Sequence, residues 1–498
     1  MIDYNHMLLQ SIIIPMAFSP LCLAAGKSET FRKNAGWIAS GTLLYSFINL
    51  VAVTYGFFSG KINGTLVASY NWVPAIGDFV LLADGINILV AVTIALLSWL
   101  ITIYSMAYME HEENLGAYFA LYLLYSGSML GAVLTTNFVA FFVFFELMLL
   151  PSWAMIGVWG TGAKERIAFK YFMFTEAGAL SLLAGIILAR INTGTFDMLA
   201  MASNAAKLPG QLLLPIVSAI LLGFFVKMAI FPLHTWLPDA HAEAPTPISA
   251  LLSPAMIGIG GYAAIRVIYT AFPSILSHHT FMLTLSILGV ITIVYGGVLA
   301  LAQSDIKRLL AYSSISQMGY LLFGIASISF LGLTGSILHY INHGLCKASL
   351  FMIAGMFIHN YKTRTIKDLG GLAGLMPYTA VSALLSFLGL AGIPPLLGFW
   401  GEFYIFSGSM YTSLSSTLDM PRLIVTVAAI VSAIFTSSYG LWTIRRIFFG
   451  EPPKHLKDAK EGSIYMLAPI MTLVALVVIL GIYPTILLEI IGPSVPLG

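Results

Sequence analysis

The sequence has 498 residues, of which 59% are hydrophobic and only 9% are charged. A soluble globular domain carries about 25% charged residues, so this composition excludes a soluble protein and indicates an integral membrane protein. The formal net charge is +2 and no basic run interleaved with aromatic residues occurs, which excludes a nucleic-acid partner. The two cysteines lie in apolar segments too far apart in sequence to form a metal-ligand motif.

Long apolar segments follow one another along most of the chain. With about 20 residues per crossing, we predict an all-α polytopic membrane protein with about fourteen transmembrane helices. Their predicted limits are 7–25, 36–58, 78–106, 116–134, 137–159, 167–190, 211–231, 247–271, 281–302, 309–327, 330–358, 376–408, 422–447 and 465–491. The N-terminal segment lacks the basic region and cleavage site of a signal peptide, so we expect it to be the first membrane helix.

Basic loops predict the orientation in the membrane. Most lysine and arginine residues outside the apolar segments lie in the loops after odd-numbered helices, among them Lys164, Lys307 and Arg364. Because the positive-inside rule places such loops in the cytoplasm, both termini are expected outside.

Two apolar segments, helices 7 and 12, contain helix-breaking residues deep in the predicted membrane region: Pro232 in VKMAIFPLHTWLP, and Gly392, Pro394 and Pro395 in LGLAGIPPLLGFWGEF. Each break alone is explained by an ordinary proline kink. Their equivalent positions in helices 4–8 and 9–13 favour two inverted five-helix repeats, as in transporters with broken helices. The predicted parts are an N-terminal three-helix segment (1–110), the first repeat (111–275), the second repeat (276–450), and a cytoplasmic loop with helix 14 (451–498).

Ionisable residues lie inside several predicted spans. Glu146 and Lys227 each interrupt a long apolar run, where an ionisable group costs roughly 3 kcal/mol, so we expect the chain to use them. His339, His343 and Lys347 are spaced at i, i+4 and i+8, which places them on one helix face about 6 Å apart. Histidine changes charge near neutral pH, and we interpret this row as a proton relay. The alternatives are a structural ion pair and hydrogen bonds to neighbouring helices.

Other ionisable residues are assigned less central roles. Glu402, just after the break in helix 12, is a natural terminal site of the relay or a hydrated helix cap, and Glu176 and Asp84 are weaker candidates because they lie nearer helix ends. The segment HTWLPDAHAEAPTPISALL contains four further possible metal ligands, but their spacing matches no zinc motif. We interpret it as a rigid cytoplasmic loop that directs protons towards Lys227. The four residues are His234, Asp239, His241 and Glu243.

Several motifs together resemble one family. FFELMLLPSW, VKMAIFPLHTWLPDAHAEAPTPISALL, DIKRLLAYSSISQMGY, HYINHGLCKASLF and GIPPLLGFWGEF are similar to the antiporter-like membrane subunits of respiratory complex I and its relatives. Those relatives are F420H2 dehydrogenase, membrane-bound hydrogenases and multi-subunit Na⁺/H⁺ antiporters. The resemblance covers about residues 78–448 and is greatest to the subunit M type, which is similar to mitochondrial subunit 4. On this resemblance we expect no lateral helix of the subunit L type after helix 14.

The resemblance implies roles for these residues. It implies an input pair of Glu146 and Lys227, a central relay, and an output residue, Glu402. At the position where subunit M usually has a helix 8 lysine this chain has Gly258, and the row of His339, His343 and Lys347, which is similar to the subunit L pattern, would then supply the central link.

The sequence thus predicts a proton-translocating subunit of a respiratory dehydrogenase complex of the NADH or F420H2 type. As a non-redox subunit of a translocase, it is expected to bind no cofactor and no metal. The expected partners are other antiporter-like and small membrane subunits, membrane lipid, and a peripheral iron–sulfur redox arm, all in the plasma membrane of a prokaryote. The alternatives are a subunit of a multi-subunit Na⁺/H⁺ antiporter or membrane-bound hydrogenase, and a structural scaffold in which the ion pairs serve assembly.

Overall fold

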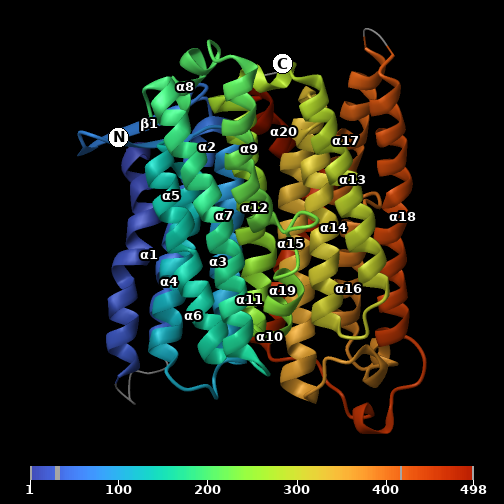
Figure 1. The fold of residues 1–498 in the computed structure, drawn as a ribbon. Helices are drawn as coiled ribbons and strands as arrows, with labels where there is room; N and C mark the ends of the chain where they lie inside the picture. Colours follow the sequence, from blue (N-terminus) through green and yellow to red (C-terminus); the bar gives the residue numbers. More distant parts are fainter. Residues whose placement is uncertain (1–2, 28–33, 416–417, 496–498) are drawn as a thin grey trace.

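The computed structural model describes residues 3–27, 34–415 and 418–495 as a bundle of long helices that run side by side (Figure 1). Among these residues, twelve helical segments are long and apolar enough to cross a membrane, which confirms the predicted all-α polytopic class. The count of about fourteen crossings stays a prediction. The segments expected at 309–327 and 376–408 are helical, but they are not among the twelve.

The N-terminal part consists of three long helices and one hairpin: α1 (Tyr4–Gly26), α2 (Asn34–Phe58), β1 (Leu66–Val73), β2 (Gly77–Ala83) and α3 (Asn87–Tyr108). The helix predicted at 78–106 therefore begins later than expected, and its first residues form a strand. Short apolar runs such as FVLLA do not distinguish strand from helix by their periodicity. Asp84 sets the start of α3, because its Oδ1 accepts hydrogen bonds from the backbone N–H groups of Ile86 and Asn87, at 3.0 Å each.

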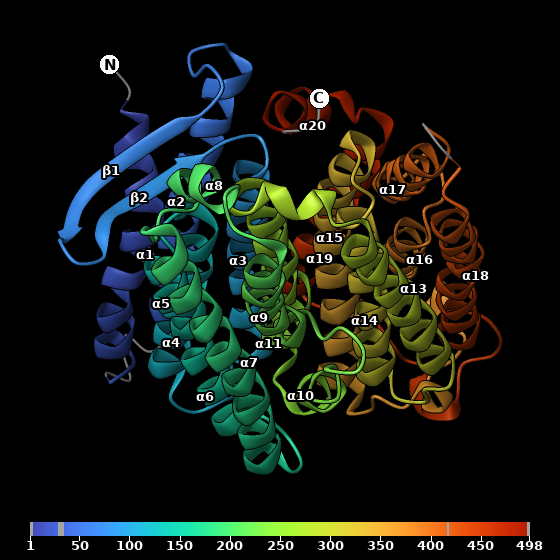
Figure 2. The same ribbon diagram turned by 45° about the horizontal axis from the view of Figure 1, so that its top comes forward.

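The hairpin lies across one end of the bundle, over the ends of α1 and its neighbours (Figure 2). β1 and β2 pair in antiparallel register, with Leu66 opposite Ala83. The carbonyl oxygen of Val80 accepts a hydrogen bond from the backbone N–H of Thr136 at 3.1 Å, which attaches the hairpin to the chain after α4. We call this the hairpin end of the bundle, and the opposite end, where α10 lies, the basic end (Figure 1).

The region predicted as the first repeat contains α4 (Leu115–Leu134), α5 (Phe138–Leu147), α6 (Leu149–Trp159), α7 (Lys164–Thr193), α8 (Met198–Ala205), α9 (Gly210–Met228), α10 (Leu237–Glu243), α11 (Thr246–Leu251), η1 (Leu252–Met256), α12 (Ile257–Ile265) and η2 (Arg266–Ala271). The helix expected at 137–159 is interrupted at Met148, three residues before Pro151. Proline cannot donate a backbone hydrogen bond within a helix, which explains the interruption. The short helix α8 was not predicted.

The region predicted as the second repeat contains η3 (Pro273–Ser277), α13 (His279–Leu301), α14 (Ile306–Ile325), α15 (Phe330–Tyr361), η4 (Ile366–Asp368), η5 (Leu372–Gly374), α16 (Pro377–Leu390), α17 (Leu397–Leu414) and α18 (Met420–Phe448). The chain continues with η6 (Lys454–Leu456), α19 (Ile464–Ile482), α20 (Thr485–Ile491) and η7 (Gly492–Ser494). The four domain limits given above stay a prediction.

Both predicted helix breaks are present. The first separates α9 from α10 at residues 229–236, and the second separates α16 from α17 at residues 391–396. In Figure 1, α9 lies towards the hairpin end and α10 at the basic end, whereas α16 lies towards the basic end and α17 towards the hairpin end. The broken segments therefore run in opposite directions, which is the arrangement of inverted repeats.

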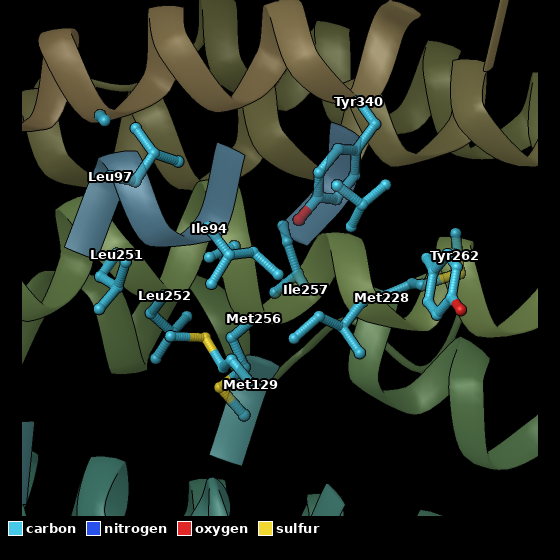
Figure 3. Packing of buried hydrophobic residues seen from close by; sticks show 14 of the residues in the cluster. Ile94, Leu97, Met129, Met228, Leu251, Leu252, Met256, Ile257, Tyr262 and Tyr340 are labelled. Carbon is cyan, nitrogen blue, oxygen red and sulfur yellow. The ribbon is translucent and has the colours of Figure 1, made fainter. Parts of the chain in front are cut away.

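Apolar side chains fill the centre of the bundle, where the first-repeat helices meet α3 and α15 (Figure 3). Figure 3 shows Met228, at the end of α9, among these residues, together with Met256 and Ile257 from the η1–α12 junction and Tyr340 from α15. All four side chains are buried. Lys227 directly precedes Met228 in α9 and therefore lies beside this apolar centre.

Candidate functional site

The predicted input pair lies beside the first break. Lys227 is in the last turn of α9 and only 1% exposed, and its Nζ lies 4.6 Å from the centre of the Phe145 ring. Glu146 follows Phe145 near the end of α5. Neither Nζ of Lys227 nor the buried Oε1 of Glu146 has a hydrogen-bond partner among the described residues. The structure thus brings the pair together around an aromatic ring rather than as a direct ion pair.

Glu176, which the sequence ranked as a weaker candidate, belongs to this group. It lies on α7 and within electrostatic range of both Glu146 and Lys227. Two carboxyl groups therefore lie near one lysine. The sequence position of Glu176 did not indicate that it lies near Glu146 and Lys227, because only the fold brings α7 and α9 together.

Asp84, the other weaker candidate, has a structural environment instead. Its Oδ1 lies 2.6 Å from Nη2 of Arg266, and both residues are buried. Arg266 also donates from Nε to the Tyr262 hydroxyl at 2.9 Å, which in turn donates to the carbonyl oxygen of Val133 at 2.7 Å. This fully bonded network ties α3, α4 and α12 together.

The row on α15 is fully buried and carries few hydrogen bonds. His339 contacts the carbonyl oxygen of Gln317 through Nε2 at 3.3 Å, and its Nδ1 has no partner among the described residues. Neither ring nitrogen of His343 has one. Lys347 donates to the carbonyl oxygen of Leu310 at 3.1 Å and to the Ser313 hydroxyl. The middle histidine is thus the unbonded group of the row.

The second break positions Glu402. This residue lies on α17, is 7% exposed, and leaves its Oε1 without a partner among the described residues. Gly392 has a φ of +66°, and a Cβ atom there would lie 2.5 Å from Oε2 of Glu402. Only glycine therefore leaves room for the carboxyl group in this position.

Polar side chains of α14 and α18 lie between Lys347 and Glu402, and the sequence analysis missed them. Gln317 and Tyr320 on α14 each contact the Thr436 hydroxyl on α18 at 3.4 Å. Glu402 is within electrostatic range of Tyr320. Their signal was present in DIKRLLAYSSISQMGY, where Ser313, Gln317 and Tyr320 recur at helical spacing. With Ser313 on Lys347, they form a polar path through the second repeat.

His241 also joins the α15 row. It is fully buried on α10, its ring stacks on Phe351 at a centroid distance of 4.8 Å, and neither ring nitrogen has a partner among the described residues. It lies within electrostatic range of Lys347 and His343. We predicted that this segment directs protons towards Lys227. His241 does not fit that prediction, because α10 turns this side chain towards α15.

Gly258, where a helix 8 lysine was expected from the resemblance, is filled from the second repeat. A Cβ atom at Gly258 would lie 2.2 Å from Cε2 of Tyr340. The Tyr340 ring thus occupies the space that a side chain on this turn of α12 would need. No group of three or more histidine, cysteine, aspartate or glutamate residues in the described part of the chain is arranged to hold a metal ion.

Comparison with known proteins identifies the relatives of this arrangement. Residues 135–430 match the family model described as NADH:quinone oxidoreductase/Mrp antiporter, and residues 72–119 match that of NADH-ubiquinone oxidoreductase (complex I), chain 5 N-terminus. The NADH-quinone oxidoreductase subunit M of Rhodobacter capsulatus is 31% identical over 98% of this chain and 96% of its own length.

Two further comparisons concern a curated relative and a solved structure. The Na⁺/H⁺ antiporter subunit A1 of Staphylococcus aureus strain JH9 is 33% identical over 96% of this chain, which spans 61% of the length of that relative. A subunit in the structure of the Mrp complex from Dietzia sp. DQ12-45-1b has the same fold, with a TM-score of 0.88 and 22% identity over 99% of this chain and 97% of that one.

Proposed function

The chain belongs to the family of antiporter-like membrane subunits shared by NADH:quinone oxidoreductase and Mrp antiporters, and from this premise we propose that it moves protons across the membrane for a redox complex. In this proposal the complex is a respiratory dehydrogenase of the NADH or F420H2 type. The chain is its non-redox translocase subunit, and electron transfer takes place in a peripheral iron–sulfur arm. The membrane is the plasma membrane of a prokaryote, with both termini outside.

One observation supports this function above all: buried ionisable groups accompany both helix breaks, and a polar path leads on from Lys347 to Glu402. Charges without hydrogen-bond partners are costly in a membrane protein and mark proton and ion pathways. A structural scaffold would instead bond its buried charges fully, as the Asp84–Arg266 pair does. The scaffold alternative therefore fits Asp84 and not Lys227.

The geometry suggests how charge would move. A proton that reaches the two carboxyl groups near Lys227 weakens their hold on the ammonium, which favours release of the lysine's own proton towards the bundle centre. His343, with both nitrogens unbonded, is free to accept a proton on one nitrogen and release one from the other. Lys347 and the polar side chains of α14 would pass the charge to Glu402, the output residue.

Glu146→Gln in the intact complex, reconstituted into vesicles, tests this function. We expect substrate-driven proton uptake to fall by roughly 100-fold, the low end of what a proton-transfer group contributes, while native gels show an assembled complex. Glu489→Gln, at an exposed carboxylate on α20, is the matched control. Wild-type uptake in Glu146→Gln would show that the input assignment is wrong.

A subunit of a multi-subunit Na⁺/H⁺ antiporter is the second candidate, supported by the 33% identity to the antiporter subunit and by the fold of the Mrp complex. The proton path would be nearly the same. Mass spectrometry of the chains that co-purify distinguishes the two. Iron–sulfur subunits alongside other antiporter-like and small membrane subunits support the respiratory complex, whereas membrane subunits alone with sodium-dependent proton exchange support the antiporter.

A further inference from the structure

The short helix α10 carries two carboxylates on one face. Asp239 and Glu243 are four residues apart in this helix of 7 residues, so they are neighbours on its surface. In the sequence, α10 follows the first break and precedes α11, so it lies between Lys227 and the buried helices α11 and α12.

Asp239 is bound from both repeats at once. Its Oδ2 lies 2.7 Å from Nζ of Lys170 on α7, in the first repeat. Its other oxygen, Oδ1, lies 3.0 Å from Nη2 of Arg308 on α14, in the second repeat. One carboxylate thus joins a helix of each repeat to α10.

Glu243 repeats this pattern. Its Oε2 accepts a hydrogen bond from the Thr161 hydroxyl at 3.2 Å, from the turn between α6 and α7, and its Oε1 lies 3.7 Å from Nη2 of Arg364, after α15. Arg364 also donates to the carbonyl oxygen of Ala242 at 2.7 Å, and Lys307 to that of Ala244 at 2.5 Å. The C-terminal end of α10 is therefore fixed by side chains of the second repeat and attached to a turn of the first.

The opposite side of α10 presents His241 to α15. No hydrogen bond from a described residue holds this ring, which stacks on Phe351, so its position follows that of the helix backbone. The ion pairs on the other face are partly exposed, with 25% of the Asp239 side chain and 16% of the Glu243 side chain accessible. Partly exposed ion pairs are individually weak and are screened by salt. The attachment of α10 therefore depends on several such contacts.

We propose that Asp239 and Glu243 are positioning residues that fasten α10 to both repeats and thereby hold His241 in register with the α15 row. We call these two carboxylates and their four partners, Lys170, Arg308, Thr161 and Arg364, the α10 latch. The inference rests on the proposed function, since His241 matters only where protons pass along α15. A purely structural pair would stabilise the protein without changing proton transfer.

The test uses the intact complex with Asp239→Asn and Glu243→Gln combined. We expect the complex to assemble, amide hydrogen exchange of residues 237–243 to accelerate, and proton transport to fall by roughly tenfold or more, since a small misplacement of a reacting group can cost about 100-fold. The single change Asp239→Glu keeps the negative charge, and this variant should retain most of the proton transport. Asp458→Asn, at an exposed aspartate of the same end of the molecule, is the matched control and should change neither measurement.

Two results overturn the latch: unchanged exchange of residues 237–243, or normal transport in the presence of accelerated exchange. If the double variant does not assemble, Lys170→Gln with Arg308→Gln removes the Asp239 contacts from the partner side, and normal transport there has the same meaning. Lys227→Ala in the same assay separates the two hypotheses. Loss of transport in Lys227→Ala with a normal latch variant rejects the latch alone, whereas normal transport in Lys227→Ala rejects the proposed function.

Discussion

Two half-sites, namely the residues around Lys227 and the residues around Lys347, are built differently. Around Lys227, charges of opposite sign lie near one another with an aromatic ring and no hydrogen bond to the ammonium. Around Lys347, the ammonium is hydrogen-bonded to a carbonyl and a hydroxyl, and hydroxyl and amide groups continue towards Glu402. The first half-site therefore depends on the balance between positive and negative charges. The second depends on a series of hydrogen-bonding side chains.

The apolar centre makes this difference important. Met228, Met256 and Tyr340 are buried in this centre (Figure 3), and the electrostatic neighbours of Lys227 and of Lys347 are different groups. Coupling between the two half-sites requires either water in this centre or movement of an element that touches both.

The largest expected effect comes from removing either lysine. Lys227→Ala and Lys347→Ala should each reduce proton transport by roughly 100-fold, because each is the positive group of its half-site. Proton uptake by vesicles with the reconstituted complex measures this, with Lys61→Ala at an exposed position as the control. If Lys347→Ala transports normally, the second half-site is not a relay and the comparison fails.

The next effect distinguishes the two designs by the loss of one contact in each. Ser313→Ala removes a hydroxyl that Lys347 bonds, and Phe145→Leu removes the ring beside Lys227. A lost bond to a buried charge costs about 1.5–3 kcal/mol, whereas a cation–π contact contributes about 0.5–2 kcal/mol. We therefore expect Ser313→Ala to slow proton transport more than Phe145→Leu does. A larger effect of Phe145→Leu would contradict the conclusion that the second half-site depends on hydrogen bonds.

Gly258 offers a sharper test of how the half-sites are joined. A lysine placed there meets the Tyr340 ring, so Gly258→Lys alone should not rescue Lys347→Ala. Overpacking of this kind costs about 1–3 kcal/mol, which a lowered thermal midpoint of the complex would report. Adding Tyr340→Ala to both changes opens the space, and partial recovery of proton uptake is then expected. Recovery without the Tyr340 change would show that the ring moves aside easily.

Sequence reasoning placed most of these residues but not their surroundings. The spans of α7, α13, α15 and α18 and both helix breaks follow from apolar length and from proline, which act locally. The strand at 77–83 was missed because a short apolar run has no decisive period. The partners of Glu176 and His241 were missed because they come from helices far apart in sequence.

Gly258 and Tyr340 illustrate the same limit. A glycine in a predicted helix indicates close packing or a missing side chain, and only the structure shows that a ring from another repeat fills the space. The family resemblance predicts a lysine at this place, and that difference stays a prediction. It did not show what had replaced it.

The smallest expected effect concerns pH and the α10 latch. Burial raises the pKa of Asp239, but the hydrogen bonds and charges of Lys170 and Arg308 outweigh it and hold the pKa below the ordinary value. A carboxyl group with a lowered folded pKa contributes stability above its unfolded pKa of about 3.9 and loses it as the pH falls through the folded value.

Asp239→Asn should therefore destabilise the protein at pH 7 by about 1 kcal/mol, as expected for a partly exposed pair. The difference from wild type should shrink once the pH falls below the pKa of Asp239, where the wild-type carboxyl is also neutral. Thermal-shift midpoints of both proteins across this range measure it. A difference that stays constant at acid pH would mean that shape rather than charge fastens α10.

The two breaks also differ in backbone strain. Ala229 ends α9 with a φ of +55°, and its side chain is fully buried, whereas the second break has Gly392 at +66°. A left-handed backbone costs a residue with a Cβ atom roughly 1–2 kcal/mol, and glycine adopts it without that cost. The burial of Ala229 must therefore offset a conformational cost beside Lys227, whereas Gly392 adopts the same backbone region beside Glu402 without that cost. The two ends of the proposed charge path therefore differ in the backbone strain of their helix breaks.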